Sequence, residues 1–313
     1  MRITGSTLCA FLAALLASGC GRPSAPPPAA PAAVDPAQFD GRSALREVAG
    51  LVAPGPRDAG TPGAERAALH LRDRLQALGV AAEIDAFEDD VPGGRATFRN
   101  VIGRIPGRGG ALVLVLSHYD TKSGLGPEFQ GANDGGSSTG ILLELARVLA
   151  AGPKPEVEIR FAFLDGEECR VAYGPHDGLH GSRHLALQLQ KSGRARDVLG
   201  VILLDMVGDK TLSVAVPRNG APALISAVFD AARDENARPR FSLGEGMVLD
   251  DHQPFLEAGM PAVDLIDFDY GSAPGRNDYW HTPADRMENI CAESLQTVGR
   301  VTLRMIGRLA AER

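Results

Sequence analysis

Three segments rich in apolar residues constrain the fold more than any other feature of this sequence. They are ALVLVLS at residues 111–117, EVEIRFAFL at residues 156–164 and VLGVILLDMVG at residues 198–208. Such runs are typical of strands that are buried on both faces, as in a parallel sheet. Segments with apolar residues at helical spacing separate them, at residues 138–150 and 182–190. This alternation predicts an α/β fold with a mostly parallel central β-sheet flanked by helices.

The rest of the chain continues the pattern. The same periodicities predict further helices at residues 61–79, 221–235 and 292–310, and further strands at residues 80–87, 96–105 and 261–268. Pro62 and Gly79 stand near the start and just after the end of the first of these helices, where those residue types are favoured. Neither an internal repeat nor a linker divides this region. We therefore expect residues 40–313 to form one domain.

The N-terminus has the pattern of an export signal. Arg2 precedes the apolar run LCAFLAALLA, and Ser18, Gly19 and Cys20 follow it, so residues 1–20 are expected to be a signal peptide. The ending LASGC resembles a bacterial lipobox, in which Cys20 would be the lipidated first residue of the mature protein; plain cleavage is the alternative. The Pro/Ala-rich residues 21–39 predict a semi-extended tether. We expect an exported protein that is lipid-anchored at the bacterial cell envelope, or otherwise periplasmic or secreted.

Charge and hydropathy exclude two classes of partner. The formal net charge is -7 and no Lys/Arg-rich run occurs, which argues against binding to nucleic acid. Beyond the signal, nothing approaches the ~18 consecutive apolar residues of a membrane span, so membrane contact is expected only through a lipidated Cys20. Of the cysteines outside the signal, Cys169 lies in an acidic loop and Cys291 near the last helix. Two unpaired thiols are expected, with a disulfide as the alternative, and the protein is expected to be a monomer.

Histidines and carboxylates follow the ends of the predicted buried strands. These residues are His118 and Asp120 after the first strand, Glu167 and Glu168 after the second, Asp205 in the third, Asp134 in a Gly-rich turn before a helix, and His281 next to the single tryptophan, Trp280. In open α/β sheets, ligands bind outside the carboxyl ends of the strands. Mixed imidazole and carboxylate ligands suit zinc, whose catalytic sites keep an open position. The sequence therefore predicts a zinc site at this edge of the sheet.

Each of these residues alone would be weak support. An isolated Asp at a strand end is usually a turn or cap residue, and a solvated surface pair is the alternative reading of the adjacent carboxylates Glu167 and Glu168. An isolated His is more often a hydrogen-bonded structural group than a ligand. That structural role is expected for His70, His176, His180 and His184. The prediction of a metal site therefore rests on the combination.

In order and type, these motifs resemble those of the zinc aminopeptidases that carry two co-catalytic metals. The segments DGEECRVAYGPHDGLHGSRHLA, DDHQPFLEAGMPAVDLI and WHT more closely resemble the glutaminyl cyclases of the animal type, which share that fold. The resemblance covers roughly residues 45–309 and implies a zinc aminopeptidase-like architecture. It implies that the N-terminal Gln of peptides or proteins is converted to pyroglutamate, with release of ammonia. It also implies one Zn²⁺ per chain, held by Asp134, Glu168 and His281.

The resemblance assigns the remaining site residues as well. Glu167 would be the general acid/base, and Asp250 and Asp205 would form a hydrogen-bonded carboxylate network around it. Trp280 and Tyr173 would line the substrate pocket.

Several positions depart from the animal cyclases. Tyr173 replaces a tryptophan, Leu249 replaces a glutamine and Asp264 replaces a histidine of the proton network. Ser117 and Thr139 replace two cysteines that form a disulfide in the animal enzymes. These departures affect the expected rate, pH optimum and substrate fit more than the type of reaction.

Two other functions use the same residues. If His118 and Asp205 bind a second metal with Asp134 as a bridge, Glu167 would activate a water and the protein would be a di-zinc aminopeptidase. A non-catalytic, substrate-binding lipoprotein would be expected to lack a ligand or the base, and none is missing here. The sequence alone does not distinguish one bound metal ion from two.

Overall fold

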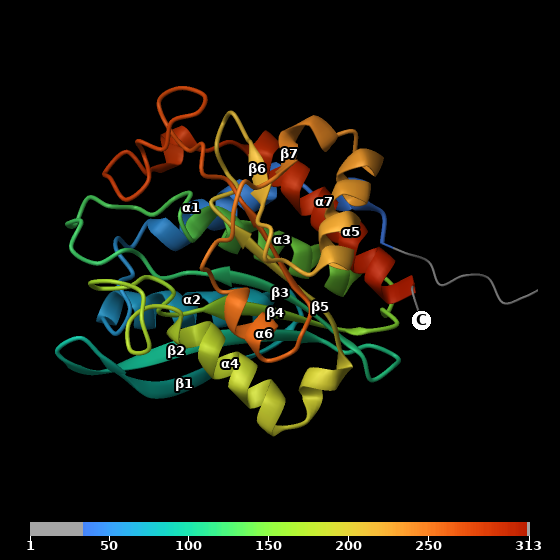
Figure 1. Cartoon of the computed structure of the whole chain (residues 1–313), viewed down its shortest axis with the longest axis horizontal. Helices are drawn as coiled ribbons and strands as arrows, with labels where there is room; N and C mark the ends of the chain where they lie inside the picture. Colours follow the sequence, from blue (N-terminus) through green and yellow to red (C-terminus); the bar gives the residue numbers. More distant parts are fainter. Residues whose placement is uncertain (1–33, 312–313) are drawn as a thin grey trace, which may run out of the picture. The chain divides into compact units, whose positions relative to one another are not determined.

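The computed structural model describes residues 34–311. The expected signal peptide, Cys20 and most of the expected tether lie outside these residues. Within them, eight strands form one sheet in the order β1-β2-β4-β3-β5-β8-β6-β7 (Figure 1). The strands are β1 (Ala81–Val91), β2 (Gly94–Ile105), β3 (Leu112–His118), β4 (Glu158–Leu164), β5 (Val198–Asp205), β6 (Val214–Val216), β7 (Phe241–Leu243) and β8 (Ala262–Ile266).

The centre of the sheet is parallel, as predicted. β3 pairs in parallel with both β4 and β5, and β5 pairs in parallel with β8. The hairpin of β1 and β2 adds to β4 in the antiparallel direction, and the short β6 is antiparallel to β8. Every residue of β3 is buried, which explains its continuous apolar sequence. The parallel arrangement brings the carboxyl ends of four strands to one edge.

Helices cover both faces of the sheet. They are α1 (Gly41–Val52), α2 (Pro62–Ala77), α3 (Gly136–Ala151), α4 (His180–Lys191), α5 (Pro222–Asp234), α6 (Gln253–Glu257) and α7 (Ala292–Ala311). Because side chains alternate along a strand, Val113 and Val115 of β3 pack into the larger core with α1, α2, α3, α5 and α7. Leu114 and Leu116 face the smaller core with α4 and α6. Figure 1 shows α4 and α6 together on one side and α3, α5 and α7 on the other.

Local sequence sets the helix starts that matter for the site. Thr61 caps α2 by accepting from the backbone N–H groups of Gly63 and Ala64. α3 follows Gly135, whose φ is +75°. A Cβ at Gly135 would lie 2.9 Å from the His118 ring, so only glycine lets this turn pass close to the end of β3. The residue before that glycine is Asp134, which the turn thereby places beside His118.

The folded unit begins earlier than composition suggested. Residues 36–38, assigned to the tether, form a short 3₁₀ helix that Asp35 caps, with a hydrogen bond of 2.9 Å to the N–H of Ala37. Phe39 is 1% exposed, and a Cβ on Gly299 of α7 would lie 2.2 Å from its ring. The boundary at residue 39 is thus corrected: residues 34–39 pack on the domain because Phe39 buries its ring against α7.

Two further expectations concern cysteines and membranes. Within residues 34–311, Cys169 and Cys291 are both free thiols, as predicted. Among the described residues, no helix is long and apolar enough to cross a membrane.

Candidate metal centre and active site

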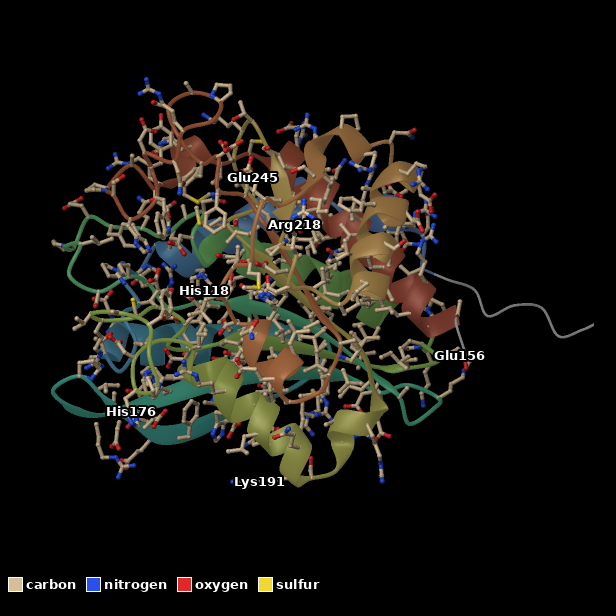
Figure 2. The ribbon with its side chains drawn as sticks, in the orientation of Figure 1. His118, Glu156, His176, Lys191, Arg218 and Glu245 are labelled. Atoms are coloured by element: carbon tan, nitrogen blue, oxygen red, sulfur yellow. The ribbon has the colours of Figure 1, made fainter. Side chains whose placement is uncertain are left out.

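The predicted site residues converge at the carboxyl edge of the parallel strands. His118 and Asp205 end β3 and β5, and the pair Glu167 and Glu168 follows β4. Figure 2 shows His118 in the interior of the molecule, whereas His176 and Lys191 lie at the surface. The adjacent glutamates are 6% and 7% exposed. They are therefore not a solvated surface pair.

Asp134, Glu168 and His281 form the first ligand group. His281 Nε2 lies 2.9 Å from Glu168 Oε1 and 3.2 Å from Asp134 Oδ2. One ligand atom from each of the three residues lies within 4.8 Å of the others. Both carboxylates are buried, while the His281 side chain is 22% exposed. The geometry matches the three-residue zinc set that the resemblance implied.

His118, Asp134 and Asp205 form a second group of the same kind. His118 Nε2 lies 3.1 Å from Asp134 Oδ1 and 3.2 Å from Asp205 Oδ1. Asp134 belongs to both groups and turns one oxygen to each histidine. The ligand set that a two-metal enzyme would need is therefore assembled as well.

Two buried carboxylates hold the ligand-bearing turns in place. The two oxygens of Asp120 accept from the backbone N–H groups of Glu167 and Glu168, each at 3.2 Å. Asp285 accepts from the N–H of Asn133 at 2.7 Å and from the N–H of Asp134 at 3.1 Å. Neighbours that orient metal ligands in this way tune affinity as well as geometry. Our reading of the sequence missed the role of Asp285, because a lone Asp in a loop carries no local signal.

Arg57 is a further buried group that sequence reasoning missed. It is 1% exposed and donates to the backbone oxygens of Tyr119, Gln130 and Gly131 at 2.7, 2.7 and 3.0 Å. Burial lowers the pKa of Arg57 to about 10, against the opposing effect of Asp285 and other carboxylates. The guanidinium therefore stays charged at neutral pH and clamps the loop that leads to Asp134.

The cluster strongly favours positive charge at its two histidines. Burial lowers the pKa of His118, but the neighbouring carboxylates of Asp120, Asp134 and Asp205 raise it well above the ordinary value. Burial also lowers the pKa of His281, but Asp134 and Glu168 raise it, and the result is a pKa of about 9. Burial and the neighbouring Asp134 raise the pKa of Glu168 to about 7. A divalent cation would supply the positive charge that these carboxylates require.

The residues present fit zinc. Asp134 Oδ2 and Glu168 Oε2 are buried oxygens that make no hydrogen bond among the described residues, with His281 Nε2 3.2 Å from the first and Lys122 Nζ 3.5 Å from the second. A bound cation would satisfy both oxygens more fully. Two carboxylates and one imidazole are donors that zinc accepts, and three protein ligands leave an open position. This donor set suits zinc better than magnesium or calcium, which prefer oxygen ligands alone.

Glu167 is buried among other acids and touches Tyr173. The Tyr173 hydroxyl donates to Glu167 Oε1 at 2.7 Å. Burial, with the charges of Glu168, Asp250 and Asp251, raises the pKa of Glu167 well above its ordinary value. A carboxyl group of this kind can hold a proton near neutral pH and pass it on.

The expected carboxylate network differs in detail. Among residues 34–311, Asp205 pairs with His118 and Asp250 accepts from the N–H of Asp251 at 2.5 Å, and neither hydrogen-bonds to Glu167. Asp250 therefore acts on Glu167 through its charge. Asp264 is fully buried, neither of its oxygens hydrogen-bonds to a residue within 34–311, and burial raises its pKa well above the ordinary value.

The mouth of the site is apolar. Trp280 is 39% exposed and stacks on His281, with 4.2 Å between ring centroids, and its ring meets the edge of Phe268. Of the nine large apolar side chains exposed within residues 34–311, six lie on the loops that carry Glu168, Asp250 and His281. We call this set the apolar rim; it comprises Val171, Tyr173, Met247, Leu249, Phe268 and Trp280. Exposed apolar side chains gathered around a site are typical of a surface that receives a ligand.

Two of the histidines expected to be structural, His180 and His184, pack against the β1–β2 hairpin. His180 stacks on Phe98 and hydrogen-bonds to Asp89 at 2.8 Å. His184 stacks on Phe87, with 3.8 Å between ring centroids. These contacts join the start of α4 to the β1–β2 hairpin.

The positions of the two replaced cysteines are also neighbours. Ser117 Oγ lies 3.1 Å from Thr139 Oγ1, so a hydrogen bond joins the two positions at which the resemblance implied cysteines in the animal enzymes.

Comparison with known proteins places this arrangement in a family. The model of peptidase family M28 matches residues 100–306. The chain belongs to peptidase family M28. This M28 chain is 29% identical over 279 residues to the glutaminyl-peptide cyclotransferase of Boiga irregularis, covering 77% of the chain and 74% of that protein.

Solved structures agree with this placement. An Acidobacteriales bacterium glutaminyl cyclase superimposes with a TM-score of 0.82 at 33% identity, covering 92% of this chain and 99% of that one. A Zn-dependent exopeptidase from Parabacteroides distasonis is also similar, with a TM-score of 0.75 at 28% identity, covering 86% of this chain and 98% of that one. Within the M28 family, the chain is therefore related to glutaminyl cyclases, on the zinc aminopeptidase-like fold that the sequence predicted.

Proposed function

We propose that this protein is a glutaminyl cyclase, which converts the N-terminal Gln of peptides or proteins to pyroglutamate and releases ammonia. The observation that carries the proposal is a buried Glu167 next to a three-residue metal group, in a chain whose relatives are named glutaminyl-peptide cyclotransferases. The reaction joins two groups of the same residue and needs an acid/base and an electrophilic site.

One carboxyl group can carry out both proton transfers that the cyclisation needs. The α-amine of the substrate attacks its own side-chain amide carbon, a C–N bond forms in the new ring, and the bond to the amide nitrogen breaks. Glu167 takes a proton from the attacking amine and returns one to the departing nitrogen, which leaves as ammonia. The raised pKa of Glu167 makes both transfers feasible near neutral pH. Asp250 lies in the same acidic cluster and raises the pKa of Glu167, which helps Glu167 to keep the proton.

Zinc would be held by Asp134, Glu168 and His281. When bound, it would polarise the amide carbonyl and stabilise the negative charge that develops on its oxygen. We propose one ion per chain, because the cyclisation consumes no water and so needs no second metal to activate one. Asp120 and Asp285 keep the ligand-bearing turns fixed through their backbone hydrogen bonds.

Tyr173 and Trp280 would form the walls around the substrate glutamine. Trp280 is next to the ligand His281 and stacks on it, and Tyr173 reaches Glu167. The rest of the substrate peptide would extend out of the site over the apolar rim. The substrates are thus proposed to be peptides or protein N-termini.

A di-zinc aminopeptidase is the second candidate. The group of His118, Asp134 and Asp205 favours it, as does the likeness to a Zn-dependent exopeptidase. In that enzyme Glu167 would activate a water and the N-terminal residue would be released.

Location and assembly remain proposals from the sequence. We propose that the protein is exported and that Cys20 carries the lipid that tethers the domain to a membrane. Cys20→Ser should move the protein from the detergent phase to the aqueous phase in a Triton X-114 partition; an unchanged partition would contradict the anchor. We propose a monomer without a nucleic-acid partner.

The proposed reaction is tested by ammonia release. Purified protein with one equivalent of zinc should release ammonia from a Gln-initiated peptide. It should release none from the same peptide with an acetylated N-terminus, because the attacking amine is blocked. Full activity only with two equivalents of zinc, together with release of the first residue from a Leu-initiated peptide, would favour the aminopeptidase.

A further inference from the structure

The hydroxyl of Tyr173 is the one protein group within residues 34–311 that hydrogen-bonds to the side chain of Glu167. Resting on the proposed function, we infer that Tyr173 is a positioning residue whose hydroxyl fixes the Glu167 carboxylate and so selects the oxygen that exchanges protons with the substrate. This role differs from lining the pocket, which the ring alone could perform.

Other neighbours cannot hold Glu167 in place. The groups whose charges act most on it besides His118 are Glu168, Asp250 and Asp251. These carboxylates repel an ionised Glu167, and a flexible side chain would turn away from them. The phenol contact, at 2.7 Å, is stronger than a hydrogen bond between neutral groups whenever Glu167 is ionised, the form in which it accepts the proton of the substrate amine.

The loop that carries Tyr173 is itself fixed. The carboxylate of Asp177 accepts from three successive backbone N–H groups, those of Arg170, Val171 and Ala172, at 2.6, 2.8 and 3.0 Å. The hydroxyl of Tyr173 therefore projects from an ordered turn, although the residue is 40% exposed.

A glycine on the same loop leaves room for the ring of Tyr173. Gly178, with φ of +78°, lies against it, and a Cβ there would be 2.5 Å from the ring. The next residue, Leu179, donates its N–H to the backbone oxygen of Glu167 at 2.9 Å. Both ends of the contact thus belong to one short, closed loop, which keeps the distance between phenol and carboxylate constant.

The contact has a directional consequence. Because the hydroxyl donates to Oε1, that oxygen acts as the acceptor, and a proton taken from the substrate amine goes to Oε2. The same oxygen then returns the proton to the departing nitrogen. Glu167 would serve both transfers without rotating its carboxyl group.

Three variants separate the hydroxyl from the ring. Tyr173→Phe should lower kcat about 10-fold, the lower end of what a lost hydrogen bond to a charged group costs, with KM and Tm unchanged. Tyr173→Ala also removes the wall and should raise KM. Tyr279→Phe is the matched control, because the Tyr279 hydroxyl makes no hydrogen bond among the described residues and its ring packs on Tyr270; it should keep wild-type kinetics.

A wild-type kcat in Tyr173→Phe, or a loss confined to KM, would overturn the inference. A crystal structure of Tyr173→Phe gives a second readout that does not depend on the reaction. The inference expects the Glu167 carboxylate to rotate or to occupy several positions, and an unmoved carboxylate would contradict it. If the wild-type protein releases no ammonia, the proposed function fails, and this structural readout still decides the positioning role.

Discussion

Replacing the two adjacent glutamates one at a time should separate proton transfer from metal binding. Glu167→Gln keeps the shape of the side chain, and its amide oxygen can still accept from the Tyr173 hydroxyl. What it loses is the ability to carry a proton. Glu168→Gln instead removes a negative ligand that lies 2.9 Å from His281 Nε2.

The structure sets the size of each effect. Glu167 is 6% exposed, so bulk water has little access to replace it, and its loss should cost about 10²–10⁴-fold, the usual range for general acid/base catalysis. The loss should appear in kcat, since little ground-state binding is removed. Mutating a residue that only orients a metal ligand typically lowers metal affinity about 10–100-fold. Because Glu168 is itself a proposed, buried ligand, Glu168→Gln should lower zinc affinity by more than that.

The assay combines zinc titration with ammonia release from a Gln-initiated peptide. Glu156→Gln is the matched control, because Glu156 precedes β4 and lies at the opposite end of that strand from Glu167 (Figure 2). Its contact with Arg108 is on the surface, where ion pairs contribute about 0–1 kcal/mol. Equal loss of zinc in the two site variants, or an active Glu167→Gln, would refute the division of roles.

Three further outcomes are expected. Zinc affinity of the metal-free protein should fall about tenfold per pH unit between pH 9 and pH 7, because His281, with a pKa of about 9, must lose its proton to bind. Below pH 7 the fall should be steeper, because Glu168 has a pKa of about 7 and must lose a proton as well. Calorimetry in buffers of different ionisation enthalpy should detect the released protons, and a flat pH profile would contradict the assignment. Asp285→Asn loses one of the two hydrogen bonds from the backbone of Asn133 and Asp134. It should lower zinc affinity about 10–100-fold in the same titration, and an unchanged affinity would exclude a positioning role for Asp285. A Gln-Phe peptide should have a kcat/KM at least about 10-fold above a Gln-Glu peptide, since burying a Phe side chain on the apolar rim contributes about 1.5–3 kcal/mol; equal values would argue against contact with the rim.

The central elements and the metal ligands could be predicted because their signals are local. β3, β4 and β5 are continuous apolar runs, and His118 and Asp205 stand at the ends of two of them. A parallel sheet necessarily gathers such ends at one edge. Strand positions therefore predicted a metal site at this edge, whereas the resemblance supplied the ligand set of Asp134, Glu168 and His281.

The missed elements had weak or misleading signals. α1 directly follows the Pro/Ala-rich residues and was overlooked, although Asp40 caps it and Ala44, Val48 and Leu51 are buried at helical spacing. β6 and β7 have three residues each, too few for a period to be recognised.

The missed site residues depend on tertiary packing. Asp285 accepts a hydrogen bond from the N–H of Asn133, which is 152 residues away in the sequence. Arg57 donates to three backbone oxygens that are distant from it in the sequence. The contact between Tyr173 and Glu167 depends on how the loop folds over the site. No spacing rule encodes such contacts.

In the proposed function, the buried carboxyl group of Glu167 serves a cyclisation and not a hydrolysis. Mass spectrometry of one Gln-initiated peptide, incubated with the zinc-loaded protein, distinguishes the two reactions directly. We expect a product that has lost one ammonia and keeps every residue, with no free glutamine. A shortened peptide accompanied by free glutamine would contradict it.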